Sequence, residues 1–167
     1  MSRKPEIDAR VEKLQNAIGK ALWEIQGVEQ MLAKYHAIVF QLDSEPTLTA
    51  AEIEKQFEEN FNHTVGRLVG LIKKADGGNG IAVEELENFV SERNWLVHKF
   101  RREVYLSLTT DDAFEKVITR VQALDRKSSE LIDMFHNKLI QYFVGLGTPK
   151  ELIETEQAKV LHEIYGS

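Results

Sequence analysis

Apolar residues recur at alternating steps of four and three along the beginning of the chain. The positions that share this spacing are Ile7, Val11, Leu14, Ile18, Ala21, Ile25, Val28, Leu32, Tyr35, Val39 and Leu42. Such a period is typical of a helix with one apolar face and is close to the seam of a coiled coil. The pattern predicts one long amphipathic helix, which Glu45-Pro46 would end because the residue before a proline leaves the helical region. We interpret the seam as bundle core, with a contribution to an oligomer as the alternative.

A second helix is expected to begin at a capping box. Thr49 and Glu52 have the spacing at which each side chain bonds the backbone N–H of the other residue. The apolar positions that follow are Ile53, Phe57, Phe61, Leu68, Ile72 and Ala75. The run from Asp76 to Gly80 predicts a stop and a turn. We do not interpret this glycine-rich run as a phosphate-binding loop, because no strand precedes it and no Gly-Lys-Ser/Thr follows it.

Two more long helices are expected in the second half of the chain. The third helix runs from about Val83 to about Leu106. The candidates for the N-cap of the fourth helix are Thr109, Thr110, Asp111 and Asp112. Glu115 is placed to complete a capping box from Asp112.

Glycines mark the end of the fourth helix, and a proline marks the start of a short fifth one. Gly145 and Gly147 predict the stop, and Thr148-Pro149 has the form of an N-cap followed by a first-turn proline. No segment alternates as a strand would. The sequence thus predicts an all-α fold, an up-down bundle of about five helices with a long N-terminal helix, in one domain over residues 1–167.

The amino-acid composition indicates a globular protein and excludes several kinds of site. Hydrophobic residues make up 43% and charged residues 29% of the chain, which is typical of a globular domain. There is no cysteine, so disulfides, thiolate zinc sites and cysteine nucleophiles are excluded. We find no signal-peptide pattern after Met1 and no apolar run long enough to span a membrane. We therefore expect a cytoplasmic protein without membrane contact.

Arg93 lies in the middle of an apolar stripe on the third predicted helix. The apolar members of this stripe are Leu86, Phe89, Val90, Leu96, Val97, Phe100 and Val104. A guanidinium among core positions is costly unless it is paired or lines a cavity. We expect Arg93 to reach the edge of the stripe, to meet a carboxylate of a neighbouring helix such as the acid-rich second one, or to line a cleft.

A polar stripe lies beside the apolar one. Its members are Glu87, Ser91, Asn94, His98, Arg101 and Tyr105. Asn94 and His98 are one turn apart, so a hydrogen bond between them would orient the imidazole. Trp95 is expected to project away from the apolar stripe, where an exposed tryptophan commonly marks a contact with another helix or subunit. The third helix thus needs partners on two faces, which predicts a central place in the bundle or at a dimer interface.

The same helix carries a local excess of positive charge. Four cations and no acid lie between Arg93 and Arg102, although the whole chain has a formal net charge of −6. The global charge argues against a protein that coats nucleic acid, whereas the local field would suit one bound phosphate. A solvated helix face is the alternative interpretation of these charges.

The run Arg93-Asn94-Trp95-Leu96-Val97-His98 resembles the signature of HEPN-domain proteins. That family's pattern is an arginine followed within a few residues by a histidine, commonly with a polar residue after the arginine. The resemblance rests on this hexapeptide and on the all-helical architecture. It implies a metal-independent endoribonuclease without a cofactor, acting as a toxin or effector of a bacterial toxin–antitoxin or defence system.

The resemblance also implies roles for individual residues. His98 would be the general acid or base, because imidazole exchanges protons near neutral pH. Arg93 would stabilise charge on the scissile phosphate of RNA, and Asn94 would position the phosphate or a catalytic group. The candidates for substrate binding are Lys99, Arg101, Arg102 and Tyr105.

A second copy of the chain is part of this hypothesis. Five residues on a straight helix place Arg93 and His98 about 140° apart in azimuth. One chain would therefore not aim both at one phosphate, and we expect a homodimer through the third helix, including Trp95. The alternative function is a non-catalytic helical interaction module, such as an immunity, antitoxin or regulatory partner of another protein.

The sequence indicates no metal site. Its histidines are His36, His63, His98, His136 and His162. They are scattered along the chain without the acid-and-histidine spacing of bundle di-metal sites. We therefore expect neither a metal nor a cofactor.

Overall fold

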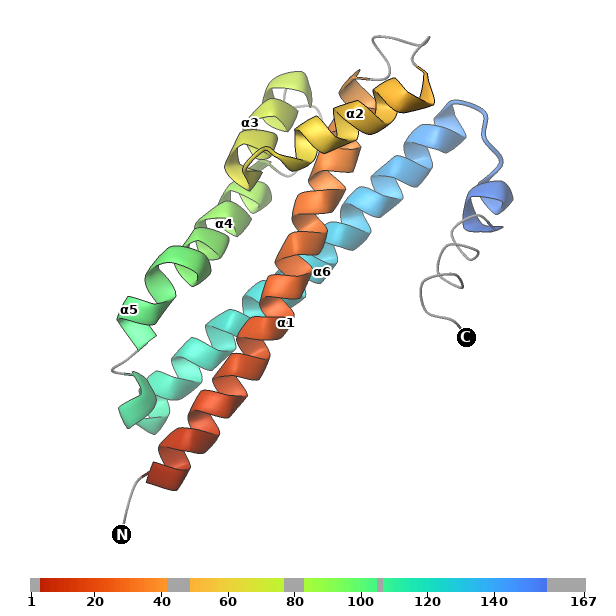
Figure 1. Cartoon of the computed structure of the whole chain (residues 1–167). Coiled ribbons are helices and arrows are strands. Elements are labelled where there is room, and N and C mark those ends of the chain that lie inside the picture. The colour runs from red at the N-terminus through yellow and green to blue at the C-terminus, as the bar shows by residue number, and fades with distance from the viewer. Residues whose placement is uncertain (1–3, 42–48, 77–82, 105–106, 156–167) are drawn as a thin grey trace.

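The computed structural model describes residues 4–41, 49–76, 83–104 and 107–155, in which all regular elements are helical (Figure 1). The all-α prediction and the long N-terminal helix are confirmed. The elements in chain order are α1 (Lys4–His36), the π-helical η1 (Ala37–Gln41), α2 (Ala50–Phe61), α3 (Val65–Asp76), α4 (Val83–Asn94), the π-helical η2 (Trp95–Lys99), α5 (Phe100–Val104), the 3-10 helical η3 (Ser107–Thr109) and α6 (Asp111–Gly145). Residues 150–155 are also helical.

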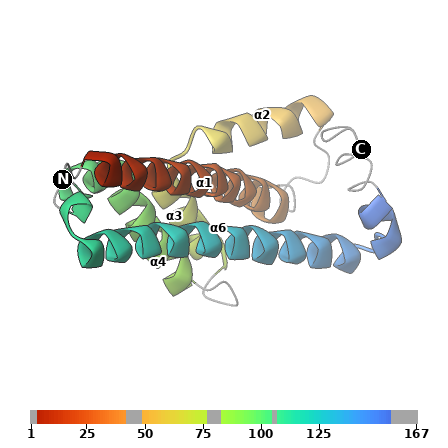
Figure 2. The same cartoon turned by 90° about the horizontal axis from the view of Figure 1, so that it is seen from below.

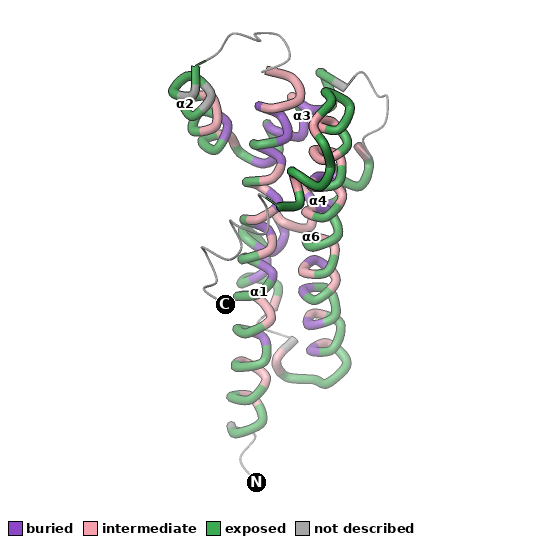
Figure 3. Tube along the Cα trace, turned by 90° about the vertical axis from the view of Figure 1, so that its right-hand side faces the viewer, coloured by how far each residue is buried: buried purple, intermediate pink, exposed green. Residues whose placement is uncertain are grey.

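The two longest helices, α1 and α6, lie side by side and run in the same direction (Figures 1 and 2). Lys13 Nζ lies 3.6 Å from Glu115 Oε1 near their first turns, and the rings of Tyr35 and Phe135 are 5.0 Å apart near the far end. Buried positions recur along both helices (Figure 3). The fully buried members of this seam include Ala21, Ile25, Val28, Leu32, Ile118, Val121, Leu131 and Phe135. The apolar period of the first helix therefore forms bundle core.

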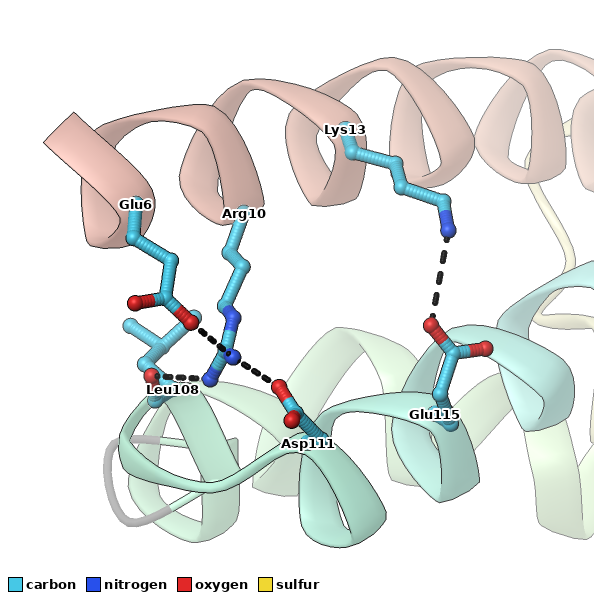
Figure 4. Close-up of polar contacts among 6 residues, drawn as sticks. All are labelled: Glu6, Arg10, Lys13, Leu108, Asp111 and Glu115. Carbon is cyan, nitrogen blue, oxygen red and sulfur yellow. Dashed lines mark hydrogen bonds and ion pairs between the residues drawn. The ribbon is translucent and has the colours of Figure 1, made fainter.

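A polar cluster joins the first turns of α1 and α6 (Figure 4). The guanidinium of Arg10 lies between the carboxylates of Glu6 and Asp111, and its Nη1 donates to the carbonyl of Leu108 at 3.1 Å. Arg10 keeps only 12% of its side chain exposed. The cluster holds the start of α6 beside the beginning of α1.

The helix α4 runs antiparallel to α6. Lys127 Nζ binds Glu85 Oε2 at 2.6 Å, whereas Arg120, two turns earlier on α6, binds Glu92 two turns later on α4. Lys73 near the end of α3 binds Glu87 near the start of α4 at 2.7 Å. The direction of the chain therefore alternates from α3 to α4 to α6, as expected of an up-down bundle. The Arg93–His98 run therefore lies beside α6 where Arg120 contacts Glu92 and Trp95.

The second predicted helix is two helices, so its prediction as one is wrong. The chain leaves α2 at Asn62 and starts α3 at Val65, where Thr64 Oγ1 accepts from the N–H of Arg67 at 3.3 Å. A hydroxyl three residues before a free N–H is an N-cap arrangement. The turn also leaves Phe61 with 45% of its surface exposed, although it belongs to the predicted apolar face.

A buried hydrogen-bond chain holds this turn against the end of α1. His36 Nδ1 lies 3.0 Å from Asn60 Oδ1, and Asn60 Nδ2 donates to Gln41 Oε1 and to the carbonyl of Gln56, both at 2.7 Å. Since the Asn60 amide donates to two oxygens, its own oxygen faces His36, which therefore carries its proton on Nδ1. Burial lowers the pKa of His36, the Asn60 bond partly restores it, and nearby His63 lowers it further.

The predicted helix ends agree with the structure in part. The Thr49–Glu52 capping box is present, α6 ends at Gly145, and Gly147 has a φ of 92°. The box predicted from Asp112 is wrong, because Thr110 is the N-cap and Asp112 instead pairs with Lys116. The stop predicted at Glu45-Pro46 lies outside the described residues. In the described ranges, no helix is long and apolar enough to cross a membrane.

Candidate functional site

A π turn interrupts the helix that carries the Arg93–His98 run. The N–H of Phe100 bonds the carbonyl of Trp95, five residues earlier, in place of the four-residue α bond. Residues five apart are about 140° apart on an α-helix, and a five-residue turn brings them toward one face. The rings of Trp95 and Phe100 accordingly meet edge to face, with centroids 5.4 Å apart. The straight helix assumed from the sequence is therefore wrong at this point.

Trp95 is buried, which corrects the prediction that it projects to the wet side. Its exposed fraction is 6%, and its indole Nε1 donates to Glu103 Oε2 at 2.7 Å. The guanidinium carbon of Arg120 on α6 lies 3.7 Å from its ring centroid. Arg120 in turn makes a two-pronged contact with Glu92, with bonds of 2.7 and 2.9 Å. Partners within the chain thus cover the indole that was expected at a dimer interface.

Because of the π turn, a different apolar residue, Val97, faces outward. Val97, predicted on the core stripe, is 44% exposed, whereas Leu96 beside it is buried. Part of the predicted apolar stripe is therefore wrong, because the wider turn shifts the register after Asn94. The exposed isopropyl group lies next to His98 in sequence.

Arg93 is half-buried and paired with a carboxylate of α1. Its Nε donates to Glu29 Oε1 at 3.1 Å, its Nη2 lies 3.1 Å from the same oxygen, and its Nη1 donates to Asn94 Oδ1 at 3.3 Å. The prediction of a carboxylate partner on a neighbouring helix is confirmed, although the partner comes from α1 rather than from the second helix. These contacts engage at most three of the five guanidinium N–H donors.

Asn94 is engaged by Arg93, and the hydrogen bond expected between Asn94 and His98 is not formed. His98 is exposed, as are Lys99, Arg101 and Arg102. Among the described residues, none of these four side chains has a hydrogen-bond or ion-pair partner. The predicted substrate-binding residue Tyr105 lies outside the described residues.

Glu29, the partner of Arg93, lines a hollow that the sequence did not indicate. This hollow has a volume of about 520 Å³ and lies between α1 and the α2–α3 turn. Its lining residues are Gln26, Glu29, Gln30, Lys34, Phe61, His63 and Leu68. We call it the α1 hollow. The signal for it was the break at Asn62–Thr64, where Phe61 stays exposed at the end of α2.

Within the described ranges, no group of three or more histidine, aspartate or glutamate side chains gathers in a metal-binding arrangement.

No family model, no curated protein and no solved structure matches this chain.

Proposed function

We propose that this chain is a metal-independent endoribonuclease whose chemistry resides in Arg93, Asn94 and His98. The observation that carries the proposal is the state of the two ionisable residues. His98 is exposed in a run with Lys99, Arg101 and Arg102, which have no hydrogen-bond or ion-pair partner in the described part of the chain. Arg93 is oriented by Glu29 and Asn94, and these contacts leave at least two of its N–H donors unused. Phosphodiester cleavage without a metal can use an accessible imidazole for proton transfer and an oriented guanidinium to stabilise charge on the phosphate.

The reaction would be an internal transesterification of RNA. One His98 imidazole would take the proton of a ribose 2′-hydroxyl, whose oxygen would bond to the adjacent phosphorus. The bond from phosphorus to the 5′ oxygen would break, and a protonated His98 would give that oxygen its proton. Arg93 would stabilise the charge on the phosphate oxygens through its free N–H groups. The products would be a 2′,3′-cyclic phosphate and a 5′-hydroxyl.

Two copies of His98 would serve as the base and the acid. The exposed Val97 beside His98 supports a homodimer centred on η2, because it is an apolar group on an otherwise charged surface. Trp95, which was predicted at the dimer interface, is buried within the chain and is not part of this proposed interface. In this arrangement, Lys99, Arg101 and Arg102 of both copies would hold the RNA backbone.

The test is cleavage of single-stranded RNA by the purified chain in excess EDTA. We expect products ending in a 2′,3′-cyclic phosphate, and no cleavage where the nucleotide before the bond carries a 2′-deoxyribose. Cleavage that stops in EDTA, or that continues at the 2′-deoxy position, would overturn the mechanism.

A non-catalytic interaction module is the second candidate. The Glu29–Arg93 pair favours it, because the pair gives the arginine a structural role without any chemistry. An absence of nuclease activity together with stoichiometric binding of a protein partner would support this function over the first.

A further inference from the structure

We infer that the α1 hollow and the helix face that continues from it form a binding track for single-stranded RNA. This inference rests on the proposed function and names a recognition surface separate from the Arg93–His98 run. The track is composed of Trp23, Gln26, Gln30 and Lys34 on α1, together with Phe61 at the end of α2. We call these five residues the α1 track.

Two exposed aromatic rings lie along the α1 track. Trp23 is 71% exposed and Phe61 is 45% exposed, which are large fractions for side chains of their size. Trp23 and Gln30 are seven residues apart, so they share a face of α1 about 10 Å along its axis. Phe61 lines the hollow at the other end of this face. Exposed rings on a groove are the stacking platforms that single-stranded nucleic acids use.

The polar groups between the rings suit nucleotides better than a protein surface. Gln26 and Gln30 bring amides that both donate and accept, as base edges do. Lys34 contributes an exposed ammonium at the end of the hollow. A protein-docking face would instead gather aliphatic and aromatic side chains at its centre.

The acids of this part of α1 do not oppose a phosphate backbone. Glu24 accepts from Ser129 Oγ at 3.1 Å, on the side of α1 that faces α6. Glu29 lines the hollow, and its charge is balanced by Arg93. Lys20 and Lys34 remain as exposed charges at the two ends of the segment. The exposed charges of α1 near the α1 track are therefore lysines, while Glu58 and Glu59 of α2 are exposed just before Phe61.

The Glu29–Arg93 pair connects the α1 track with the proposed active site. Glu29 borders the hollow, and Arg93 belongs to the run that ends at His98. An RNA strand in the hollow would therefore lie one side chain, that of Glu29, away from the arginine proposed to contact the scissile phosphate. The volume of the hollow, about 520 Å³, lies within the range of small-ligand sites and accommodates a base stacked on Phe61.

The test measures binding without cleavage in His98→Ala protein. An oligouridylate of about 12 nucleotides falls within the site sizes of single-strand binders. We expect it to quench tryptophan emission, because Trp23 is 71% exposed while Trp95 is 6% exposed. Duplex RNA of equal length should quench far less, and uridine monophosphate should bind only weakly.

The affinity of each variant for a labelled oligouridylate, measured by fluorescence anisotropy, shows which residues of the α1 track bind RNA. Trp23→Ala and Phe61→Ala should each weaken binding about tenfold to a hundredfold, and Trp23→Phe should bind nearly as wild type because a phenyl ring still stacks. Lys34→Ala should lower the salt dependence of the affinity by about one phosphate contact. Lys116→Ala, an exposed lysine on α6, is the control and should bind normally.

Equal affinity of Trp23→Ala, Phe61→Ala and the parent would overturn the inference, as would equal binding of duplex and single strand. A shift of Trp23→Ala from dimer to monomer without a change in RNA affinity would also overturn it, because a second copy would then cover the ring. These outcomes are separable from the proposed function. Binding on the α1 track without cleavage by the wild-type chain would refute the nuclease and support the α1 track.

Discussion

Nε and Nη2 of Arg93 both lie 3.1 Å from Oε1 of Glu29, across the contact between α4 and α1. The arginine is thus held before any substrate arrives, and its function cannot be separated from the stability of this contact by a single substitution. Both side chains keep less than a third of their surface, 24% and 31%, so solvent screens the pair only in part.

A double-mutant cycle on this pair measures its strength. We expect Glu29→Ala and Arg93→Ala each to lower the free energy of unfolding by about 1–3 kcal/mol, because either one leaves a partly buried charge without its partner. The double variant should be less destabilised than the sum, with a coupling of at least about 0.5 kcal/mol. Urea denaturation gives these values. Strictly additive losses would show that the pair contributes nothing.

Trp95 and Trp23 provide a matched test of whether the π turn buries the ring of Trp95. Trp95→Ala should destabilise the fold by about 3–5 kcal/mol, because it removes a buried ring and leaves Glu103 and Arg120 without the group between them. Trp23→Ala should change stability by less than about 0.5 kcal/mol, since the ring is 71% exposed. Thermal and urea unfolding compare them. Equal losses for the two variants would contradict the burial of Trp95.

Acidification should loosen the α2–α3 turn through His36. Its pKa is lowered in the folded protein, so below the unfolded value of about 6.5 the unfolded chain binds the proton more readily. Stability from this residue is therefore present above about pH 6.5 and is lost as the pH falls toward the lowered pKa. We expect the urea midpoint to fall between about pH 7.5 and 5.5, and to fall less in His36→Gln. Identical pH profiles of the two proteins would exclude this role.

The proposed dimer depends on an exposed valine. Val97→Asp should dissociate the dimer and abolish cleavage while leaving the helical content unchanged, because the residue is exposed in the single chain. Val144→Asp is the matched control, since Val144 on α6 has the same exposure of 44%. Light scattering and circular dichroism read out the two effects. A wild-type monomer that still cuts RNA would show that one chain suffices.

The fold could be predicted from the sequence because its long helices carry uninterrupted apolar periods. The seam from Leu14 to Leu32, the Thr49–Glu52 box and the glycine stop at Gly145 are local signals, and each is confirmed. The break at Asn62–Thr64 was missed because apolar residues on its two sides keep nearly helical spacing. A threonine cap without an acid three residues later gives only a weak signal.

The candidate site was less predictable for a physical reason. An α-helical period assigned Trp95 outward and Val97 inward, and the structure reverses both, because one five-residue turn shifts the register after Asn94. What stabilises that turn is tertiary: Arg120 on α6 stacks on the indole, and Glu103 accepts its N–H. Contacts between residues far apart in sequence leave no local pattern. One of the alternatives expected for Arg93, a carboxylate partner on a neighbouring helix, is confirmed, because the cost of burying a charge is independent of register.

Catalysis by the Arg93–His98 run is best tested by comparing two histidine substitutions in an RNA cleavage assay in EDTA. His98→Ala removes an exposed imidazole from the Arg93–His98 run, so it should fold as the wild type and cut RNA at least about a hundredfold more slowly. His136→Ala changes a histidine of α6 that lies sixteen residues, or about 24 Å, beyond Arg120, and it should retain wild-type cleavage. Equal cleavage by His98→Ala and His136→Ala, or no cleavage by the wild type, would contradict the assignment of catalysis to the Arg93–His98 run.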